Sequence, residues 1–398
     1  MSLNSSDRNT TILIAGILSL VIGVGAARFA FTSLLPAMLD DWLDLRLAGL
    51  LASINFIGYL GGAILAIFIT NLHTKIRLFR LGIILSVLTT LLLGLTHNEM
   101  IWLIDRIVAG FGSAMVLVVG SAIVMTKLDM PDRTRAMGIH FSGIGLSILL
   151  SDLVVRVIIS FGGSWQQAWI GLGLFALVLS PFVLRTLRIE HASRLHIPHH
   201  RFSFRVFTPF TVLLIIAYFT EGVGFVVQGT FLPDIINSIP GLEGYGGYTW
   251  LLVGIAGIPS SILWMRLAHR YGSVNMIIAA MLLQVVGILI PALTRDPILN
   301  LLSGVLYGGT FVGLVALFLH LGGELAGKNP VVLMGALTSA YGIGQVSAPL
   351  YSVALTERFG SYDAALYLTA AITGFGAFLM FVGRGLRGSP RSPRPDDR

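Results

Sequence analysis

The stretch RFAFTSLLP (28–36) recurs in altered form as FVVQGTFLP (225–233), about half a chain further on. Within and beside these stretches, Gly25 pairs with Gly222, Ser33 with Thr230 and Pro36 with Pro233, all at an offset of 197 residues. More pairs keep the same order at offsets of 197 to 199: MG at 137–138 and 334–335, GIG at 143–145 and 342–344, and FGGSWQQA at 161–168 with FGSYDAAL at 359–366. Short matches that keep both order and spacing indicate an internal duplication.

The composition places the duplicated chain in lipid. Of its 398 residues 55% are hydrophobic and 11% are charged, and the mean hydropathy is +0.86. Soluble domains carry about 25% charged residues because water must wet their surface. The chain is therefore neither a soluble enzyme, nor a coiled coil, nor disordered. A membrane β-barrel is excluded because its strands alternate over about ten residues, whereas the apolar runs here are longer and do not alternate.

The apolar runs predict an all-α polytopic membrane protein with twelve transmembrane helices. They lie at 12–39, 47–70, 78–96, 100–126, 136–160, 167–187, 207–236, 248–268, 273–294, 298–322, 330–355 and 362–383. Each repeat unit holds six spans, so both copies enter the membrane from the same side. The sequence thus predicts two six-helix parallel repeats.

The distribution of basic residues predicts the orientation. Of the 26 Lys and Arg residues, only Arg46, Arg295 and Arg358 fall in the odd-numbered loops, whereas twenty fall in the termini and even-numbered loops. The positive-inside rule then places both termini in the cytoplasm and the chain in the inner membrane. The net charge of +7 is accordingly a topology signal and does not indicate nucleic-acid binding.

We expect four regions along the chain. They are an N-terminal six-helix bundle (1–187), a cytoplasmic linker (188–206), a C-terminal six-helix bundle (207–384) and a disordered cytoplasmic tail (385–398). The linker contains HIPHH, which could bind a metal, but few carboxylates accompany it and the chain has no cysteine. We therefore expect no metal and no cofactor, and interpret the histidines as part of a solvated linker.

Local motifs resemble those of the major facilitator superfamily. RIVAGFGSA (106–114) is similar to the span-four signature of that superfamily, and HRYG (269–272) to its short loop motif. GAARFAFTSLLPAML (25–39) followed by LASINFIGYLGG (51–62) resembles the bacterial YbfB/YjiJ-type transporters. The resemblance covers essentially the whole chain and implies the major facilitator fold, with spans 1, 4, 7 and 10 lining a central cavity. GIHFSGIGLS (138–147) lacks the proline of the antiporter signature, which disfavours export.

Charges within the apolar spans are the strongest functional candidates, because a central Arg or Asp costs about 2.5–3.5 kcal/mol. Arg28 and Glu221 lie near the middle of spans one and seven, and the resemblance places them on opposite walls of one cavity. We expect Arg28 to bind a substrate anion or to counter the charge of Glu221, and Glu221 to couple transport to protons. A permanent Arg28–Glu221 ion pair is the structural alternative.

For the remaining candidates, a role in solute binding and a purely structural role are both open. Arg106 matches the span-four signature and either contacts substrate or tethers helices by an ion pair with Asp105 or another carboxylate. Asp152 and Arg156 are spaced i,i+4 and predict a structural ion pair. The neutral candidates either hydrogen-bond a solute or tether helices; they are Asn55, Tyr59, Gln228, Tyr307, Thr310, Tyr341 and Gln345.

These features predict a secondary active transporter that moves a small organic solute by alternating access. Two intramembrane arginines favour an anion or zwitterion, and the lack of GxxxxGK[ST] disfavours ATP as the energy source. The expected partners are the solute, protons and the lipid bilayer; the oligomeric state stays open, with a monomer compatible. A proton-coupled exporter of drugs or metabolites is the alternative, with aromatic walls such as Phe29, Phe225 and Trp250. A membrane enzyme or sensor is a remote one.

Overall fold

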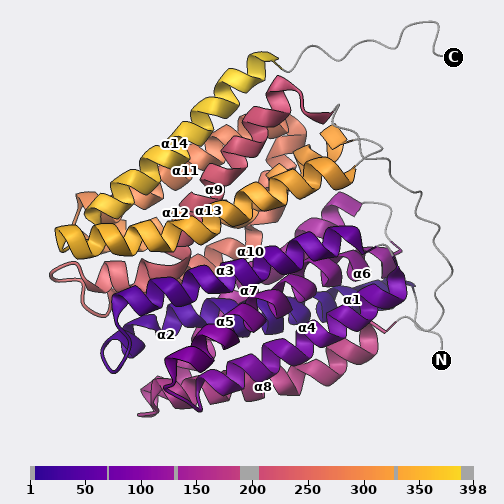
Figure 1. The fold of residues 1–398 in the computed structure, drawn as a ribbon. Helices are drawn as coiled ribbons and strands as arrows, with labels where there is room; N and C mark the ends of the chain where they lie inside the picture. The colour runs from indigo at the N-terminus through magenta and orange to yellow at the C-terminus, as the bar shows by residue number, and fades with distance from the viewer. Residues whose placement is uncertain (1–4, 70, 130–132, 189–205, 327–329, 387–398) are drawn as a thin grey trace, which may run out of the picture.

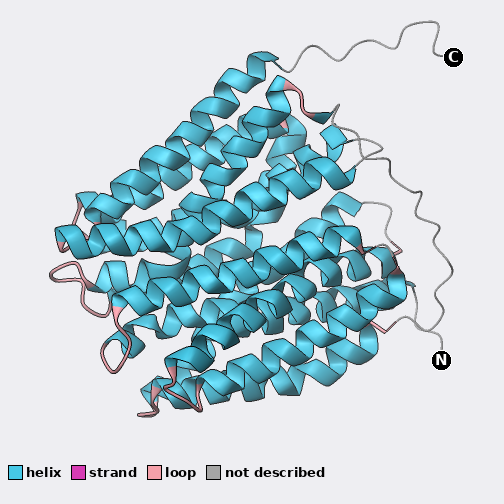
Figure 2. Cartoon of the chain, in the orientation of Figure 1, coloured by secondary structure: helices cyan, strands magenta, loops and turns pink. Residues whose placement is uncertain are grey.

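The computed structural model describes residues 5–69, 71–129, 133–188, 206–326 and 330–386, and it contains helices but no strand in these ranges (Figure 2). The helices are α1 (Ser5–Leu20), η1 (Val21–Phe29), α2 (Ala30–Leu39), α3 (Leu45–Phe68), α4 (Leu72–Leu93), α5 (Glu99–Ala114), η2 (Met115–Val119), α6 (Gly120–Lys127), α7 (Arg133–Ser160), α8 (Trp165–Thr186), α9 (Pro209–Asn237), α10 (Tyr245–Tyr271), α11 (Ser273–Leu293), α12 (Pro297–Ala326), α13 (Pro330–Phe359) and α14 (Asp363–Leu386).

The predicted membrane-spanning helices are present. Within the described ranges, 11 continuous helical stretches are long and apolar enough to cross a membrane, and α13, with 30 residues, is the twelfth long helix. Side-chain caps fix several of their starts: Asp44 accepts from the Leu47 amide, and Ser164 forms a capping box with Gln167. The predicted boundaries, which rest on the apolar runs alone, lie within a few residues of the observed ones for most of these helices.

The helices form two bundles. In Figure 1, α1–α8 make the lower, indigo-to-magenta bundle and α9–α14 make the upper, red-to-yellow one. Helix α1 begins and α14 ends on the same side of the molecule, which we call the terminal face; the other side is the opposite face. The predicted linker and tail lie almost entirely outside the described residues, as do His191, His196, His199 and His200.

A contact between the two bundles joins residues that are equivalent in the internal duplication. Thr32 of α2 donates from Oγ1 to the carbonyl oxygen of Gly229 of α9 at 2.6 Å, and the two residues are 197 positions apart. Equivalent positions of two copies touch where a pseudo-two-fold axis passes between them. The offset found in the sequence is therefore the symmetry relation of the fold.

Glycines let helices within each bundle pack backbone to backbone. A Cβ atom on Gly58 of α3 would lie 2.0 Å from the Ile107 carbonyl oxygen of α5, and one on Gly308 of α12 would lie 2.2 Å from that of Val253 in α10. At the nearby Gly61 and Gly309, by contrast, no described neighbour lies within 4 Å of an added Cβ. The close contact of α12 with α10 thus runs along the face of Gly304, where a Cβ would lie 2.5 Å from the Thr249 carbonyl oxygen, and Gly308.

Two of the long helices contain π-helical stretches, η1 and η2. They meet at Gly23, where an added Cβ would lie 2.5 Å from Cβ of Val116. A π-helical turn inserts an extra residue into the helix and is typical of functional sites. Arg28 lies in η1, so its side chain is redirected relative to a continuous α-helix.

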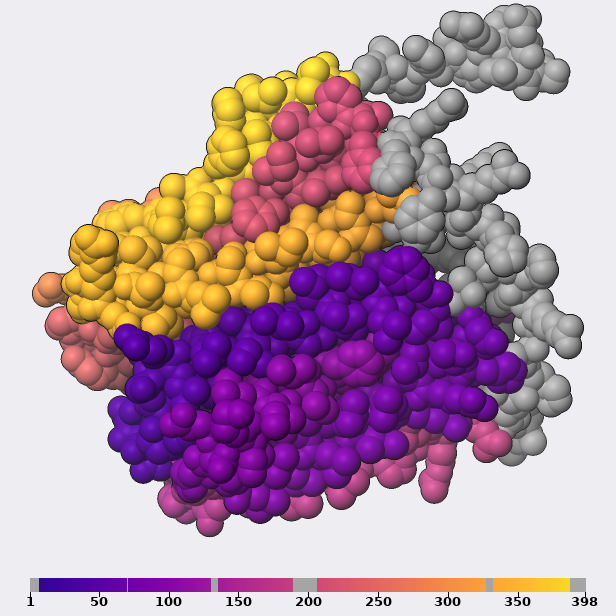
Figure 3. All heavy atoms as spheres, viewed as in Figure 1, coloured from indigo at the N-terminus to yellow at the C-terminus, as the bar shows by residue number. Residues whose placement is uncertain are grey.

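The bundles meet along two helix pairs, α7 with α10 and α3 with α13. Gly145 of α7 packs against Gly257 of α10, where a Cβ would lie 2.3 Å from the Gly257 carbonyl carbon. On the visible face in Figure 3, orange α13 lies directly on indigo α3. This arrangement surrounds the centre of the molecule with helices from both halves.

Candidate solute-binding site

Arg28 lies at the centre of the molecule inside a cage of aromatic rings. Its guanidinium carbon is 4.5 Å from the ring centre of Phe56 and 4.7 Å from that of Tyr59, both on α3. The rings of Phe29 and Phe225 follow at 5.7 and 5.6 Å. The ring faces stabilise a cation that is only 7% exposed.

Arg28 uses only part of its hydrogen-bonding capacity, in a side-chain hydrogen bond with Tyr59. Its buried Nε and Nη2 atoms have no hydrogen-bond partner among the residues that the structure describes. No carboxylate of the described residues forms an ion pair with Arg28 either. Buried N–H donors without an acceptor are costly, so Arg28 can still donate hydrogen bonds to a further group.

Arg106 of α5 lies beside Arg28. Its Nη1 donates to the Ala27 carbonyl oxygen at 3.3 Å and its guanidinium lies 4.6 Å from the ring centre of Phe31. Its Nε is buried and has no hydrogen-bond partner in the described part of the chain. Asn55 of α3 donates from Nδ2 to the Arg106 carbonyl oxygen at 3.0 Å, which fixes this segment of α5.

Arg28, Arg106 and Asn55 line one central cavity. Residues of both bundles enclose it: Phe29, Phe31, Thr32, Ala52 and Phe56 from the first, and Gly229 and Thr230 from the second. Its volume is about 10 Å³, which is at the lower limit for a single water molecule. The structure therefore captures a closed site that must open to admit a solute.

Tyrosines of the second bundle lie next to this site. The ring of Tyr341 stacks on that of Tyr218 with 4.4 Å between ring centres, and Phe225 of the Arg28 cage contacts Tyr341 with 6.2 Å between ring centres. The hydroxyl of Tyr307 donates to the Phe225 carbonyl oxygen at 2.8 Å. Tyr307 thus tethers α12 to α9 and does not offer its hydroxyl to a solute in this conformation.

Thr310 and Gln345 do not line the central cavity. The Thr310 hydroxyl donates to the carbonyl oxygens of Leu306 and Tyr307 on its own helix. Gln345 is 1% exposed and lies beside Tyr341. The sequence pattern placed both on apolar helices but contained no signal for which face meets the cavity.

Glu221 lies inside the second bundle and not on the wall of the central cavity, where we expected it. It is fully buried, and its carboxylate contacts Gln284 of α11, whose amide nitrogen can donate to Oε2 at 2.8 Å and Oε1 at 3.2 Å. No ion pair joins Glu221 to Arg28 or to another cation of the described residues. The two charges of spans one and seven therefore do not face each other across an open cavity here.

Gln228, on the same helix, also turns away from the central cavity. It is fully buried and donates from Nε2 to the Gly287 carbonyl oxygen of α11 at 3.1 Å. The expected ion pair of Asp105 is absent as well: both carboxylate oxygens are buried without a hydrogen-bond partner in the described ranges. Adjacent residues on a helix, such as Asp105 and Arg106, point about 100° apart and rarely pair.

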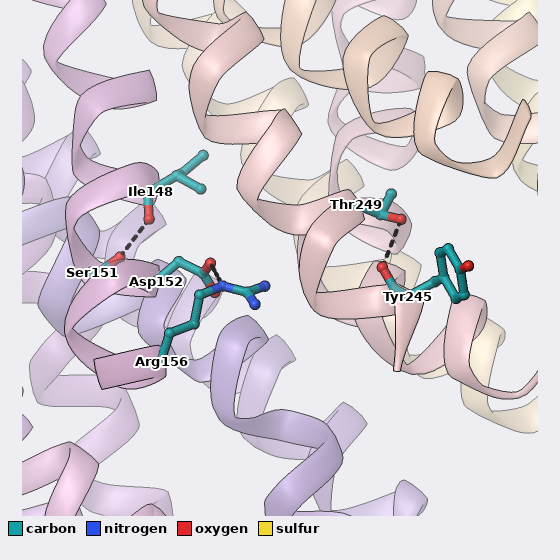
Figure 4. Close-up of polar contacts among 6 residues, drawn as sticks. All are labelled: Ile148, Ser151, Asp152, Arg156, Tyr245 and Thr249. Atoms are coloured by element: carbon teal, nitrogen blue, oxygen red, sulfur yellow. Dashed lines mark hydrogen bonds and ion pairs between the residues drawn. The ribbon is translucent and has the colours of Figure 1, made fainter. Parts of the chain in front are cut away.

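Asp152 and Arg156 form an ion pair with Nε···Oδ2 at 2.6 Å. Figure 4 shows the guanidinium of Arg156 extending from α7 towards α10. There it lies 5.1 Å from the ring centre of Tyr248 and packs on Gly247, where a Cβ would be 2.6 Å from Nη2. The pair thus connects the two bundles near the opposite face instead of merely stabilising one helix.

A second contact closes the opposite face at α3 and α13. Arg46 and Glu357 form an ion pair at 3.1 Å, although the Arg46 side chain is 79% exposed. On the terminal face, a cavity of about 820 Å³ lies between α7, α10 and α12, with Arg135, Arg266 and His320 in its wall. The molecule is therefore closed at the opposite face and hollow at the terminal face.

Some residues of the site carried no clear sequence signal. Phe56 and Thr32 contact the site but are ordinary residues of an apolar helix. Gln284 was detectable as a polar residue at the centre of the apolar run MLLQVVGIL (281–289). No cluster of three or more His, Cys, Asp or Glu residues in the described part of the chain is arranged to hold a metal ion.

Residues 20–381 match the family described as "Uncharacterised MFS-type transporter YbfB". The chain belongs to this family. Its members are transporters of the major facilitator superfamily, so the chain is a multi-pass membrane protein and a secondary transporter, and not an enzyme.

Solved structures agree with this YbfB-type assignment at the level of the fold. A point mutant of the nucleoside transporter NupG aligns with a TM-score of 0.70 at 12% identity, covering 94% of this chain and 99% of its own. A bacterial homologue of the human lysosomal transporter Spinster, in an inward-facing and unoccupied conformation, aligns with a TM-score of 0.70 at 15% identity, covering 97% and 100%. The major facilitator fold predicted from the sequence is thus confirmed.

Proposed function

We propose that this YbfB-type transporter carries a small organic anion or zwitterion, and that Arg28 and Arg106 bind its acidic group. The observation that carries the proposal is the pair of buried guanidinium groups on one cavity wall, both with unused N–H donors. Two neighbouring buried cations repel each other, and an anion between them relieves both the repulsion and the desolvation cost. Guanidinium forks suit carboxylate and phosphate groups.

The aromatic cage supports a further detail of the solute. Phe29, Phe56 and Phe225 surround the cationic group and leave an apolar wall around it. A solute whose acidic group is attached to an apolar body satisfies both features. An inorganic anion satisfies only the first of them, and a neutral sugar satisfies neither.

We further propose that Glu221 carries the coupling proton. Its ionised form is an uncompensated charge in a fully buried position, whereas its protonated form is neutral there. A conformation that opens α9 to water would favour the ionised form. Alternation between these environments would load the proton on one side of the membrane and release it on the other.

For the orientation, we propose the inner membrane, with the terminal face in the cytoplasm. The support is the distribution of arginine and lysine, which leaves Arg46, Arg295 and Arg358 as the basic residues of the loops at the opposite face. Under this orientation the cavity at the terminal face opens to the cytoplasm.

The test is a ligand screen on the purified protein by thermal shift, because a bound solute raises the unfolding midpoint as its concentration exceeds its Kd. We expect organic monoanions and zwitterions to stabilise the protein, and Arg28→Ala to abolish the stabilisation. If neutral solutes were the only hits, or if Arg28→Ala left the shift unchanged, the proposal would be wrong.

A second candidate is a proton-coupled exporter of drugs or metabolites. One observation favours it, an extended aromatic wall around Phe29. The centre of the Phe29 ring lies 6.0–6.3 Å from the ring centres of Phe225, Trp250 and Phe311. Deletion of the gene discriminates the two functions. An exporter should change sensitivity to several unrelated toxic compounds, and an importer should change growth on one nutrient.

A further inference from the structure

Gln284 is a buried polar residue at the centre of α11, a helix that lies outside the set expected to line the cavity. It is fully buried within the apolar run MLLQVVGIL (281–289). An amide in such a position is costly unless its hydrogen-bonding groups are satisfied. Gln284 therefore needs a hydrogen-bond partner inside the second bundle.

The contact of Gln284 is Glu221. With its amide nitrogen turned towards α9, Gln284 lies 2.8 Å from Oε2 and 3.2 Å from Oε1 of the carboxylate. The opposite end of the same amide is a carbonyl oxygen, which accepts a hydrogen bond and cannot donate one. Rotation of the amide by about half a turn presents that oxygen to the same carboxyl group. One side chain can thus hydrogen-bond both the carboxylate and the carboxylic acid.

The other groups around Glu221 are weaker partners for its charge. The titratable groups that face it are Tyr218 on its own helix, Tyr307 on α12 and Tyr341 on α13. From α14, the neutral residues Thr373 and Gly376 pack on α9. No cation of the described residues forms an ion pair with Glu221, so Gln284 is the group best placed to respond to its proton.

We propose that Gln284 is a positioning residue for proton coupling, which donates to ionised Glu221 through its amide nitrogen and accepts from protonated Glu221 through its amide oxygen. The inference rests on the proposed role of Glu221 and extends it to α11. Replacement of Gln284 removes the donor that stabilises the ionised Glu221 carboxylate. The protonated form of Glu221 loses less stabilisation, because its hydrogen bond with the amide oxygen joins two neutral groups. Glu221 should then release its proton only at a higher pH.

The test is a pH titration of the carboxylic-acid carbonyl band by infrared difference spectroscopy on the full chain in lipid bilayers. We expect Gln284→Met, which is close to glutamine in size, to raise the titration midpoint of Glu221 by about one to two pH units, as expected for a lost hydrogen bond to a charged group. Gln284→His, which keeps a ring donor, should restore part of the native midpoint.

Gln228→Met is the matched control. Gln228 lies on α9, is fully buried, and donates to the Gly287 carbonyl oxygen of α11. The substitution thus removes one buried glutamine from the same helix pair and leaves the Glu221 contact in place. We expect it to leave the midpoint of the band unchanged, so an equal shift in both variants would contradict the proposal.

The outcomes separate the two proposals. If the titrating band persists in Glu221→Gln, Glu221 is not the proton carrier and the proposed coupling fails. If the band disappears in Glu221→Gln but keeps its native midpoint in a folded Gln284→Met, only the role of Gln284 fails. Should Gln284→Met not fold, the same decision rests on Gln284→His, which must shift the midpoint relative to the native protein.

Discussion

The first and seventh membrane-spanning helices are repeat counterparts, yet they differ in backbone and in charge. The first consists of α1, η1 and α2, with a π-helical stretch at Val21–Phe29, whereas α9 runs as one α-helix from Pro209 to Asn237. At the offset of 197, Arg28 corresponds to Phe225 and Glu221 corresponds to Val24. Each of these two helices therefore carries a charge near mid-membrane at a position where its counterpart is apolar.

The two counterpart helices direct their charges to different places. The redirected Arg28 points to the bundle interface, where it meets Phe56 and Phe225. Glu221 points into its own bundle, where it meets Gln284. In our proposal the first half binds the solute and the second half carries the proton. Phe225, in contact with Arg28 and next to Tyr341, is the physical link between them.

The largest expected effect comes from removing the charge of the first half. We expect Arg28→Ala to weaken solute binding by about 100-fold or more, since loss of one partner of a buried charged contact costs about 2–5 kcal/mol. Arg28→Lys should recover only part, because an ammonium group lacks the planar fork of donors. Thermal shift against the best ligand measures both. Equal binding by Arg28→Ala and the native protein would remove Arg28 from the site.

Removing the charge of the second half should separate coupling from binding. We expect Glu221→Gln to abolish solute accumulation driven by a pH gradient, because an amide cannot release a proton. Exchange of external for internal solute should persist, since the Arg28 site stays intact. Both are measured in proteoliposomes with labelled solute. Accumulation at the native level in Glu221→Gln would show that another group carries the proton.

The two halves should lose similar stability when a methyl group is added at equivalent close contacts. A Cβ on Gly25 would lie 2.6 Å from the Ser147 carbonyl oxygen of α7, and one on Gly222 would lie 2.2 Å from that of Tyr341 in α13. We expect Gly25→Ala and Gly222→Ala each to destabilise the protein by about 1–3 kcal/mol, because overpacking forces backbone shifts. The measurement is the thermal unfolding midpoint, with Gly61→Ala, which has open space, as the unchanged control. A large loss in one half only would break the equivalence.

The sequence was sufficient for the fold because its signals are local or periodic. Apolar runs predicted the spans, and the offset of 197 predicted the duplication. The direction of each buried side chain was not predictable, because α9 is apolar on all sides and offers no polar face from which to orient Glu221. The π-helical stretches meet at Gly23 and Val116, which are far apart in the sequence. The aromatic cage of Arg28 likewise joins residues from three separate helices, Phe29, Phe56 and Phe225, and could not be predicted either.

The smallest effect is expected where the counterpart helices touch. Thr32→Val removes the hydrogen bond from Oγ1 to the Gly229 carbonyl oxygen and preserves the size of the side chain. Hydrogen bonds between membrane helices contribute about 0.6 kcal/mol on average, so opening of the opposite face should become roughly threefold more favourable. Because the chain has no cysteine, pairs of introduced cysteines can carry spin labels on α2 and α9 without a background signal.

Thr310→Val is the matched control for this measurement, since the Thr310 hydroxyl donates only within its own helix. We expect it to leave the distribution of spin-label distances unchanged, whereas Thr32→Val adds population at longer distances. Arg156→Gln, which removes the largely exposed cation–π contact with Tyr248 near the opposite face, should add a similar population, because such contacts at exposed sites contribute about 0.5–1 kcal/mol. If Thr32→Val and Thr310→Val gave identical distributions, the contact between equivalent positions would be a consequence of closure and not one of its causes.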